Sequence, residues 1–82
     1  MKVEVRLYGS LRRYRPATAD GSPHQPFAFA LSAGSSIDDL GRHLGLPEGL
    51  VSAAAVNGEA VENSIILREG DRVSLFPPSA GG

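Results

Sequence analysis

Only one stretch of this chain combines the apolar spacing of a full helix with the end signals of one, and this limits the folds open to it. Ile37, Leu40 and Leu44 fall at i, i+3 and i+7, which places them on one helical face. Ser36 precedes them as an N-cap, and the glycine after Leu44 is a stop signal. We therefore predict one helix over residues 37–44. Its apolar stripe is narrow, so the helix is stable only when it packs on a sheet.

Strands are predicted before this helix. Apolar residues alternate with other residues over residues 3–7 and again over residues 27–31, which is the period of a half-buried strand. We expect these two strands to be antiparallel neighbours. Between them, residues 9–26 contain three prolines and two glycines, which predicts a long loop with one helical turn over residues 11–14.

The second half of the chain predicts three more strands. Residues 53–56 lead into Asn57-Gly58, the dipeptide that best fits the two positive-φ positions of a type I′ hairpin turn. Residues 60–61 begin the return strand, and residues 73–76 form the last strand, which Pro77-Pro78 ends because proline cannot donate to a ladder. One helix on a small mixed sheet makes an α+β domain and leaves one sheet face free for a partner. The predicted core consists of apolar residues from these elements: Val3, Val5, Leu7, Phe29, Leu31, Ile37, Leu40, Leu44, Val56, Val73 and Leu75.

The composition excludes several classes of function. The chain has 82 residues, the size of one domain, and it has no cysteine, so disulfides, thiolate metal sites and nucleophilic thiols are excluded. His24 and His43 stand alone, and we expect no metal site. The net charge of −1 argues against nucleic-acid binding. No apolar run reaches the length of a membrane span, so we expect a soluble cytoplasmic protein with no membrane partner.

The chain ends in Gly81-Gly82. A glycine carboxylate is the least hindered acyl group a protein offers, because no Cβ blocks its entry into a narrow active site. The alternative interpretation is a frayed chain end. The sequence contains no convincing Ser/His/Asp set, carboxylate pair or phosphate-binding glycine motif. We therefore expect no catalytic site formed by side chains.

Three segments of the sequence share features with one known group. They are Val56-Asn57-Gly58, the turn Glu69-Gly70-Asp71-Arg72-Val73, and the end Phe76-Pro77-Pro78-Ser79-Ala80-Gly81-Gly82. Together they resemble the ubiquitin-like sulfur-carrier proteins of the ThiS/MoaD family, and the Pro-Pro tail is most similar to the small subunit of molybdopterin synthase. The resemblance implies a β-grasp domain over residues 1–76 and an extended tail over residues 77–82. The long loop 9–26 departs from the compact members of the family, which leaves the partner's identity open.

The resemblance implies that Gly82 carries the chemistry. An E1-like adenylating enzyme would use ATP to adenylate the Gly82 carboxylate, and a sulfur donor would replace AMP to leave a C-terminal thiocarboxylate. This sulfur would be donated in molybdopterin, and hence molybdenum-cofactor, biosynthesis, where the chain is a small subunit that is not catalytic alone and binds no cofactor. Residues 77–82 can span at most about 20 Å, at roughly 3.3 Å per residue. The tail that inserts Gly82 into a partner's site would consist of Pro77, Pro78, Ser79, Ala80 and Gly81.

Two features are candidates for docking to the E1-like enzyme or to a larger synthase subunit. Phe76 ends the last strand, and aromatic anchors dominate protein interfaces. Arg12, Arg13 and Arg15 form the only basic cluster, for which a solvated loop is the alternative interpretation.

Other functions stay open. The same tail suits sulfur delivery for thiamine or another sulfur metabolite. It also suits a ubiquitin-like modifier whose Gly82 forms an isopeptide bond with lysine. A plain interaction domain is the remaining alternative. A measurement of intact mass separates a sulfur carrier, a modifier and an interaction domain from one another.

Overall fold

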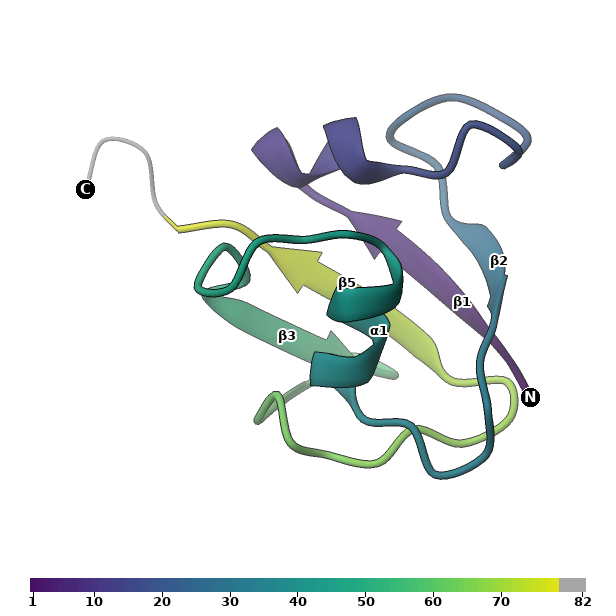
Figure 1. Cartoon of the computed structure of the whole chain (residues 1–82), viewed down its shortest axis with the longest axis vertical. Helices are drawn as coiled ribbons and strands as arrows, with labels where there is room; N and C mark the ends of the chain where they lie inside the picture. Colours follow the sequence, from purple (N-terminus) through teal and green to yellow (C-terminus); the bar gives the residue numbers. More distant parts are fainter. Residues whose placement is uncertain (79–82) are drawn as a thin grey trace.

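The computed structural model describes residues 1–78, so Ser79, Ala80, Gly81 and Gly82 of the predicted tail lie outside the described residues. Five strands form one mixed sheet in the order β2-β1-β5-β3-β4 (Figure 1). In chain order the elements are β1 (Lys2–Leu7), the 3-10 helix η1 (Gly9–Tyr14), β2 (Phe27–Ala30), α1 (Ile37–His43), β3 (Ala53–Val56), β4 (Glu59–Val61) and β5 (Arg72–Phe76).

The first and last strands pair in parallel in the sheet. Glu4 of β1 lies opposite Arg72 of β5, and Leu7 lies opposite Leu75. β2 pairs antiparallel with β1, as expected, and β3 pairs antiparallel with both β5 and β4. A mixed sheet of this order with a helix packed on one face is the β-grasp architecture, which confirms the predicted fold class.

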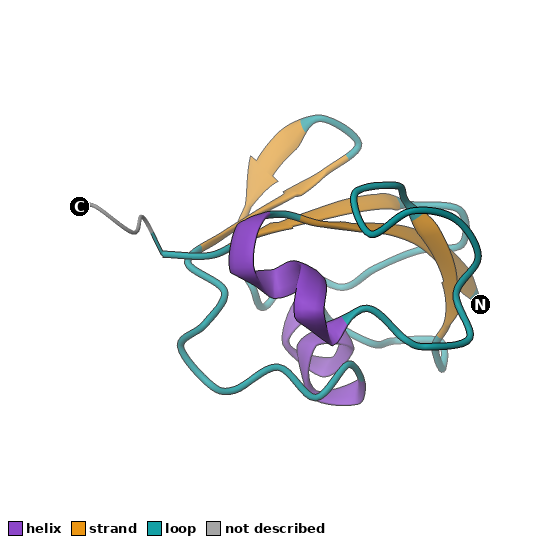
Figure 2. Ribbon diagram, turned by 90° about the horizontal axis from the view of Figure 1, so that it is seen from above, coloured by secondary structure: helices purple, strands orange, loops and turns teal. Residues whose placement is uncertain are grey.

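α1 and η1 lie on the same side of the sheet (Figure 2). Leu40 of α1 and Leu11 of η1 are both fully buried, at 0% exposure. Because both helices bury their apolar residues on this one side, the opposite face of the sheet is open over the described residues. The core comprises Val3, Val5, Leu7, Leu11, Phe27, Leu31, Ile37, Leu40, Leu44, Leu46, Ala54, Leu67, Val73 and Leu75.

Two positions of the predicted core are wrong. Phe29 and Val56 are only half-buried and pack at the margin of the core. β2 is an edge strand, and on it Phe27 is the buried aromatic, with the Arg15 guanidinium over its ring, 5.0 Å from the centroid. Phe29 meets Phe27 edge to face with centroids 6.4 Å apart, which leaves it nearer the rim. Val56 lies next to the hairpin turn, where the sheet ends.

A reciprocal capping box starts α1. The Asp39 amide donates to Ser36 Oγ at 3.2 Å, and the Ser36 amide donates to the Asp39 carboxylate at 2.9 Å. This amide, followed by the Arg42 guanidinium that pairs with the same carboxylate, holds the pKa of Asp39 below its ordinary value. The helix Ile37–His43 ends one residue earlier than predicted, because Leu44 takes the C-cap position.

The loop between β1 and β2 is more ordered than the sequence predicts. The expected single turn is the 3-10 helix Gly9–Tyr14, which Leu11 anchors in the core. The rest of the loop folds around Arg15, whose guanidinium donates hydrogen bonds to the carbonyls of Asp20 and Gln25. One arginine therefore organises a segment that has few apolar residues.

Candidate functional site

The tail begins at the end of β5. The strand stops at Phe76, as predicted, and is followed by the half-buried Pro77 and the exposed Pro78. Figure 1 shows β5 running away from the N-terminus, so this root of the tail lies at the other end of the sheet. The described part of the candidate site is therefore Pro77-Pro78 and the surface around it.

Phe76 lies on the sheet face that the helices leave open. Val73 and Leu75 are buried in the core at 1% and 0% exposure, so strand alternation turns Phe76 to the other side. Its ring stacks on Tyr8, with centroids 4.6 Å apart and planes 15° from parallel. Ala53 of β3 is its partner across the ladder. A half-buried aromatic pair next to a small residue forms a surface that a protein partner can cover.

The structure places the three arginines of the basic cluster differently. Arg12 and Arg13 are exposed in the last turn of η1. This helix starts at Gly9, which lies against the ring of Pro77, so Arg12 and Arg13 follow by three and four residues a position that contacts the root of the tail. Arg15 is half-buried, and its guanidinium is occupied within the loop. Arg12 and Arg13 are therefore the exposed members of the cluster.

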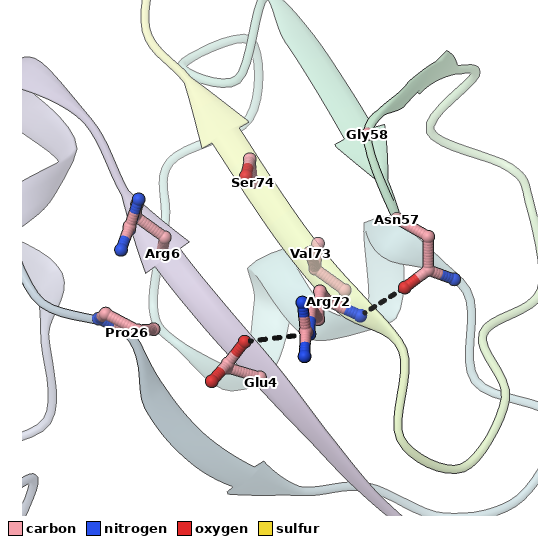
Figure 3. Close-up of a pocket in the computed structure, with 8 residues that line it drawn as sticks. All are labelled: Glu4, Arg6, Pro26, Asn57, Gly58, Arg72, Val73 and Ser74. Atoms are coloured by element: carbon pink, nitrogen blue, oxygen red, sulfur yellow. Dashed lines mark hydrogen bonds and ion pairs between the residues drawn. The ribbon is translucent and has the colours of Figure 1, made fainter.

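A hollow on the open face was not expected from the sequence. It has a volume of about 490 Å³ and lies near the start of β5, whereas the tail leaves from the end of that strand (Figure 3). Arg6 and Arg72 line it from adjacent strands, together with Glu4, which pairs with Arg72 Nε at 3.6 Å. These side chains are exposed, so the ion pair contributes little to stability. The hollow is lined by charged side chains, but it lies apart from the root of the tail.

The β3–β4 hairpin borders this hollow. Asn57 and Gly58 both have positive φ, 52° and 86°, as the sequence predicts for this turn. The Asn57 side chain also accepts from the Arg72 amide at 3.0 Å and donates to Asp71 Oδ1 at 3.0 Å. Strand alternation in the sequence was enough to predict that Glu4 lies on the open face. Its position next to Arg72 depends on the parallel pairing of β1 with β5, which alternation does not reveal.

The interior of the described residues is almost entirely apolar. Within residues 1–78 the one buried polar residue is Ser35, whose Oγ donates to the Ser32 carbonyl at 2.8 Å. No group of three His, Asp or Glu side chains in this part of the chain is arranged to hold a metal ion. Over the same residues, no helix is both long enough and apolar enough to cross a membrane.

The sheet order, the crossing α-helix and the tail root after the last strand define a ubiquitin-like β-grasp protein. SAMP1, the small archaeal modifier protein 1 of Haloferax volcanii, matches over 100% of both chains with a TM-score of 0.66 at 19% identity. The HVO 2177 protein of the same organism matches over 100% of this chain and 87% of its own, with a TM-score of 0.75 at 23% identity. At these identities the matches establish the fold alone.

A family model extends this classification. The model of the ThiS family matches residues 5–82, so the chain belongs to the ThiS family. A chain from the complex of subunits 1 and 2 of the molybdopterin-converting factor of Helicobacter pylori is 30% identical over 100% of both chains, with a TM-score of 0.58. A comparison with curated proteins gave no significant match. The chain is thus a β-grasp member of the ThiS/MoaD sulfur-carrier family.

Proposed function

We propose that this chain is a sulfur carrier for molybdopterin biosynthesis and that its Gly82 carboxylate is converted into a thiocarboxylate. One combined observation carries the proposal. The ThiS family match extends to Gly82, and the full-length identity of 30% links the chain to a molybdopterin-converting-factor complex. The 30% identity favours molybdopterin biosynthesis over the synthesis of thiamine or another sulfur metabolite as the pathway that the carrier serves.

The proposed chemistry takes place on the main chain. The Gly82 carboxylate attacks the α-phosphorus of ATP in an E1-like partner, forming an acyl-adenylate and releasing pyrophosphate. A persulfide anion of a sulfur donor then attacks the acyl carbon and expels AMP, which leaves an acyl disulfide. A thiolate attacks the donor's sulfur, forms a mixed disulfide with the donor and releases the thiocarboxylate.

The open face supplies the docking surface in this proposal. Phe76 and Tyr8 form an apolar anchor on this face beside the root of the tail. Arg12 and Arg13 add positive charge at its edge, in η1, which begins at Gly9 against Pro77 and lies on the helix side of the sheet. We therefore expect the E1-like enzyme and the larger synthase subunit to present an apolar pocket with acidic groups at its rim. Such charges speed association more than they raise affinity.

The deciding experiment is measurement of intact mass. The protein is incubated with the E1-like enzyme of the same organism, ATP and a sulfur donor. We expect an ATP-dependent gain of about 16 Da, from the replacement of one carboxylate oxygen by sulfur. Deletion of Gly82 or addition of one serine after it should abolish the gain, and Gly81→Ala should slow it because a Cβ restricts φ and adds bulk. Gly49→Ala, in an exposed loop, is the matched control and should be activated normally.

The two alternatives that are not sulfur carriers give a different mass. Adducts on lysine side chains of other proteins would identify a modifier, and an unchanged mass would leave an interaction domain. Conversion of the loaded protein's sulfur into molybdopterin by the larger synthase subunit distinguishes this pathway from other sulfur pathways. A variant with an extra C-terminal residue that still supports full molybdopterin synthesis, without being trimmed, would refute the thiocarboxylate mechanism.

A further inference from the structure

Pro77 is contacted from the β1 side by Gly9. This glycine has a φ of +55°, and a Cβ built on it would lie 2.9 Å from Pro77 Cγ and 3.6 Å from Pro77 Cδ. The proline ring therefore lies where a side chain at position 9 would be. The neighbouring residue supports the same approach, since the Tyr8 amide donates to the Leu75 carbonyl at 3.1 Å and the Tyr8 ring stacks on Phe76.

Pro77 is held from the β3 side by Ser52. The Ser52 amide donates to the Phe76 carbonyl at 2.9 Å, and Ser52 Oγ donates to the Pro77 carbonyl at 2.8 Å. Ser52 directly precedes β3, which flanks β5 on the side opposite β1. Hydrogen bonding across the sheet thus continues to Pro77, one residue beyond the end of β5, although Pro77 has no amide hydrogen of its own.

We infer that Gly9 and Ser52 form a tail clamp, which sets the direction in which Pro77 and Pro78 leave the body and so the point from which the tail reaches the partner's active site. The inference rests on the proposed function. Because proline has a fixed φ, an orientation imposed on Pro77 is passed on to Pro78 with little freedom. Neither residue of the clamp touches a reacting atom, so both are positioning residues. Their effect is on reaction geometry, where misplacement by about 1 Å can cost about a hundredfold in rate.

The variants separate aiming from folding. Ser52→Ala removes the side-chain bond to the Pro77 carbonyl, together with the longer contact of the same hydroxyl with the Phe76 carbonyl at 3.4 Å, and keeps the amide bond to Phe76. Ser52→Thr retains a hydroxyl and should restore the activity. Gly9→Ala drives a methyl group into the Pro77 ring. Its matched control is Gly34→Ala, which lies between β2 and α1 and has a φ of +89°. Apart from the chain neighbours of Gly34, no atom of residues 1–78 lies within 4 Å of the added Cβ. This control introduces backbone strain without touching the tail.

The readout is adenylation by the E1-like enzyme, followed as ATP–pyrophosphate exchange at varied carrier concentration. For Ser52→Ala we expect kcat to fall about fivefold, the net worth of one ordinary hydrogen bond. KM should change less than about twofold, since the docking surface is intact. Gly9→Ala should lower kcat more than Ser52→Ala does, and the kcat of Ser52→Thr should be close to that of wild type. Gly34→Ala should lower the melting temperature and leave kcat unchanged.

Two results would overturn the tail clamp. One is full kcat in both Ser52→Ala and Gly9→Ala. The other is a loss of kcat in Gly34→Ala as large as that in Gly9→Ala, which would assign the effect to stability. If Gly9→Ala does not fold, the serine pair decides. A nuclear Overhauser contact between the Gly9 α-protons and the Pro77 ring should be present in the isolated wild-type protein, and its absence would also overturn the clamp.

The failure of this inference is distinguishable from failure of the proposed function. If wild type is not adenylated at all, the proposed function fails and the inference falls with it. If wild type is adenylated and the clamp variants match it, the proposed function stands and only the clamp is refuted.

Discussion

Replacement of Phe76 by alanine tests whether the open sheet face is a docking surface. Phe76 is half-buried, and its principal described contact is the stack on Tyr8, with ring centroids 4.6 Å apart. Such a stack is worth about 0.5–1.5 kcal/mol beyond its buried area. We expect Phe76→Ala to lower the free energy of unfolding by about 1–2 kcal/mol, well below the 3–5 kcal/mol of a core phenylalanine. At about 4–8 °C per kcal/mol, the melting temperature should fall by roughly 5–15 °C and leave the domain folded at 25 °C.

The same change should weaken binding much more. An aromatic anchor at the centre of an interface contributes about 2 kcal/mol or more, which corresponds to about a thirtyfold rise in Kd. Calorimetric titration with the E1-like enzyme or the larger synthase subunit measures Kd, and differential scanning calorimetry measures the stability of the isolated domain. Ile66→Ala is the control, because Ile66 is 55% exposed and lies beside the start of α1, away from β5.

If Phe76 is a docking residue, Phe76→Ala should raise Kd strongly and lower the melting temperature only moderately. An unchanged Kd together with a lower melting temperature would refute the docking role of Phe76. A loss of stability near 3–5 kcal/mol would likewise show that Phe76 is part of the core. Ile66→Ala should leave both Kd and melting temperature close to wild type.

Three further predictions concern the scaffold. Leu40→Ala should lower the free energy of unfolding by about 2–5 kcal/mol in guanidinium denaturation, because Leu40 is fully buried; a change below 1 kcal/mol would contradict the core assignment. Asp39→Asn should be less stable than wild type at pH 7, because the pKa of Asp39 is lowered in the folded protein. The charged carboxylate therefore stabilises the fold above the ordinary carboxyl pKa, and this stabilisation is lost as pH falls through the folded pKa. Denaturation at several pH values should therefore show the difference closing below about pH 4, and a gap that persists into acid would contradict the capping role. Asn57→Ala should cost about 1–2 kcal/mol by thermal unfolding, since it loses the side-chain bonds to Asp71 and Arg72 at a positive-φ position, and Asn57→Gly should cost less; equal losses would contradict the φ argument.

The elements that local rules decide could be predicted from the sequence. The period-2 alternation over residues 3–7 became β1 with its apolar residues buried, and the positive φ at Asn57 and Gly58 followed from these two residue types. The helix start after Ser36 was also predicted. The placement of Phe76 on the open face follows from alternation along β5. In each case the decisive interactions join residues at most four positions apart, so the sequence contains them in full.

The tertiary structure alone decided which distant segments meet. The parallel pairing of β1 with β5 joins Glu4 to Arg72, and the contact of Gly9 with Pro77 joins the first loop to the tail. The occupation of Arg15 within its loop belongs to the same group. Strand order depends on which arrangement buries the most apolar surface summed over all the elements. The spacing of residues within a single segment carries no information about that total. The sequence therefore determined the local elements and contained the proposed reactive end, whereas the contacts that hold Pro77 at the root of the tail required the folded chain.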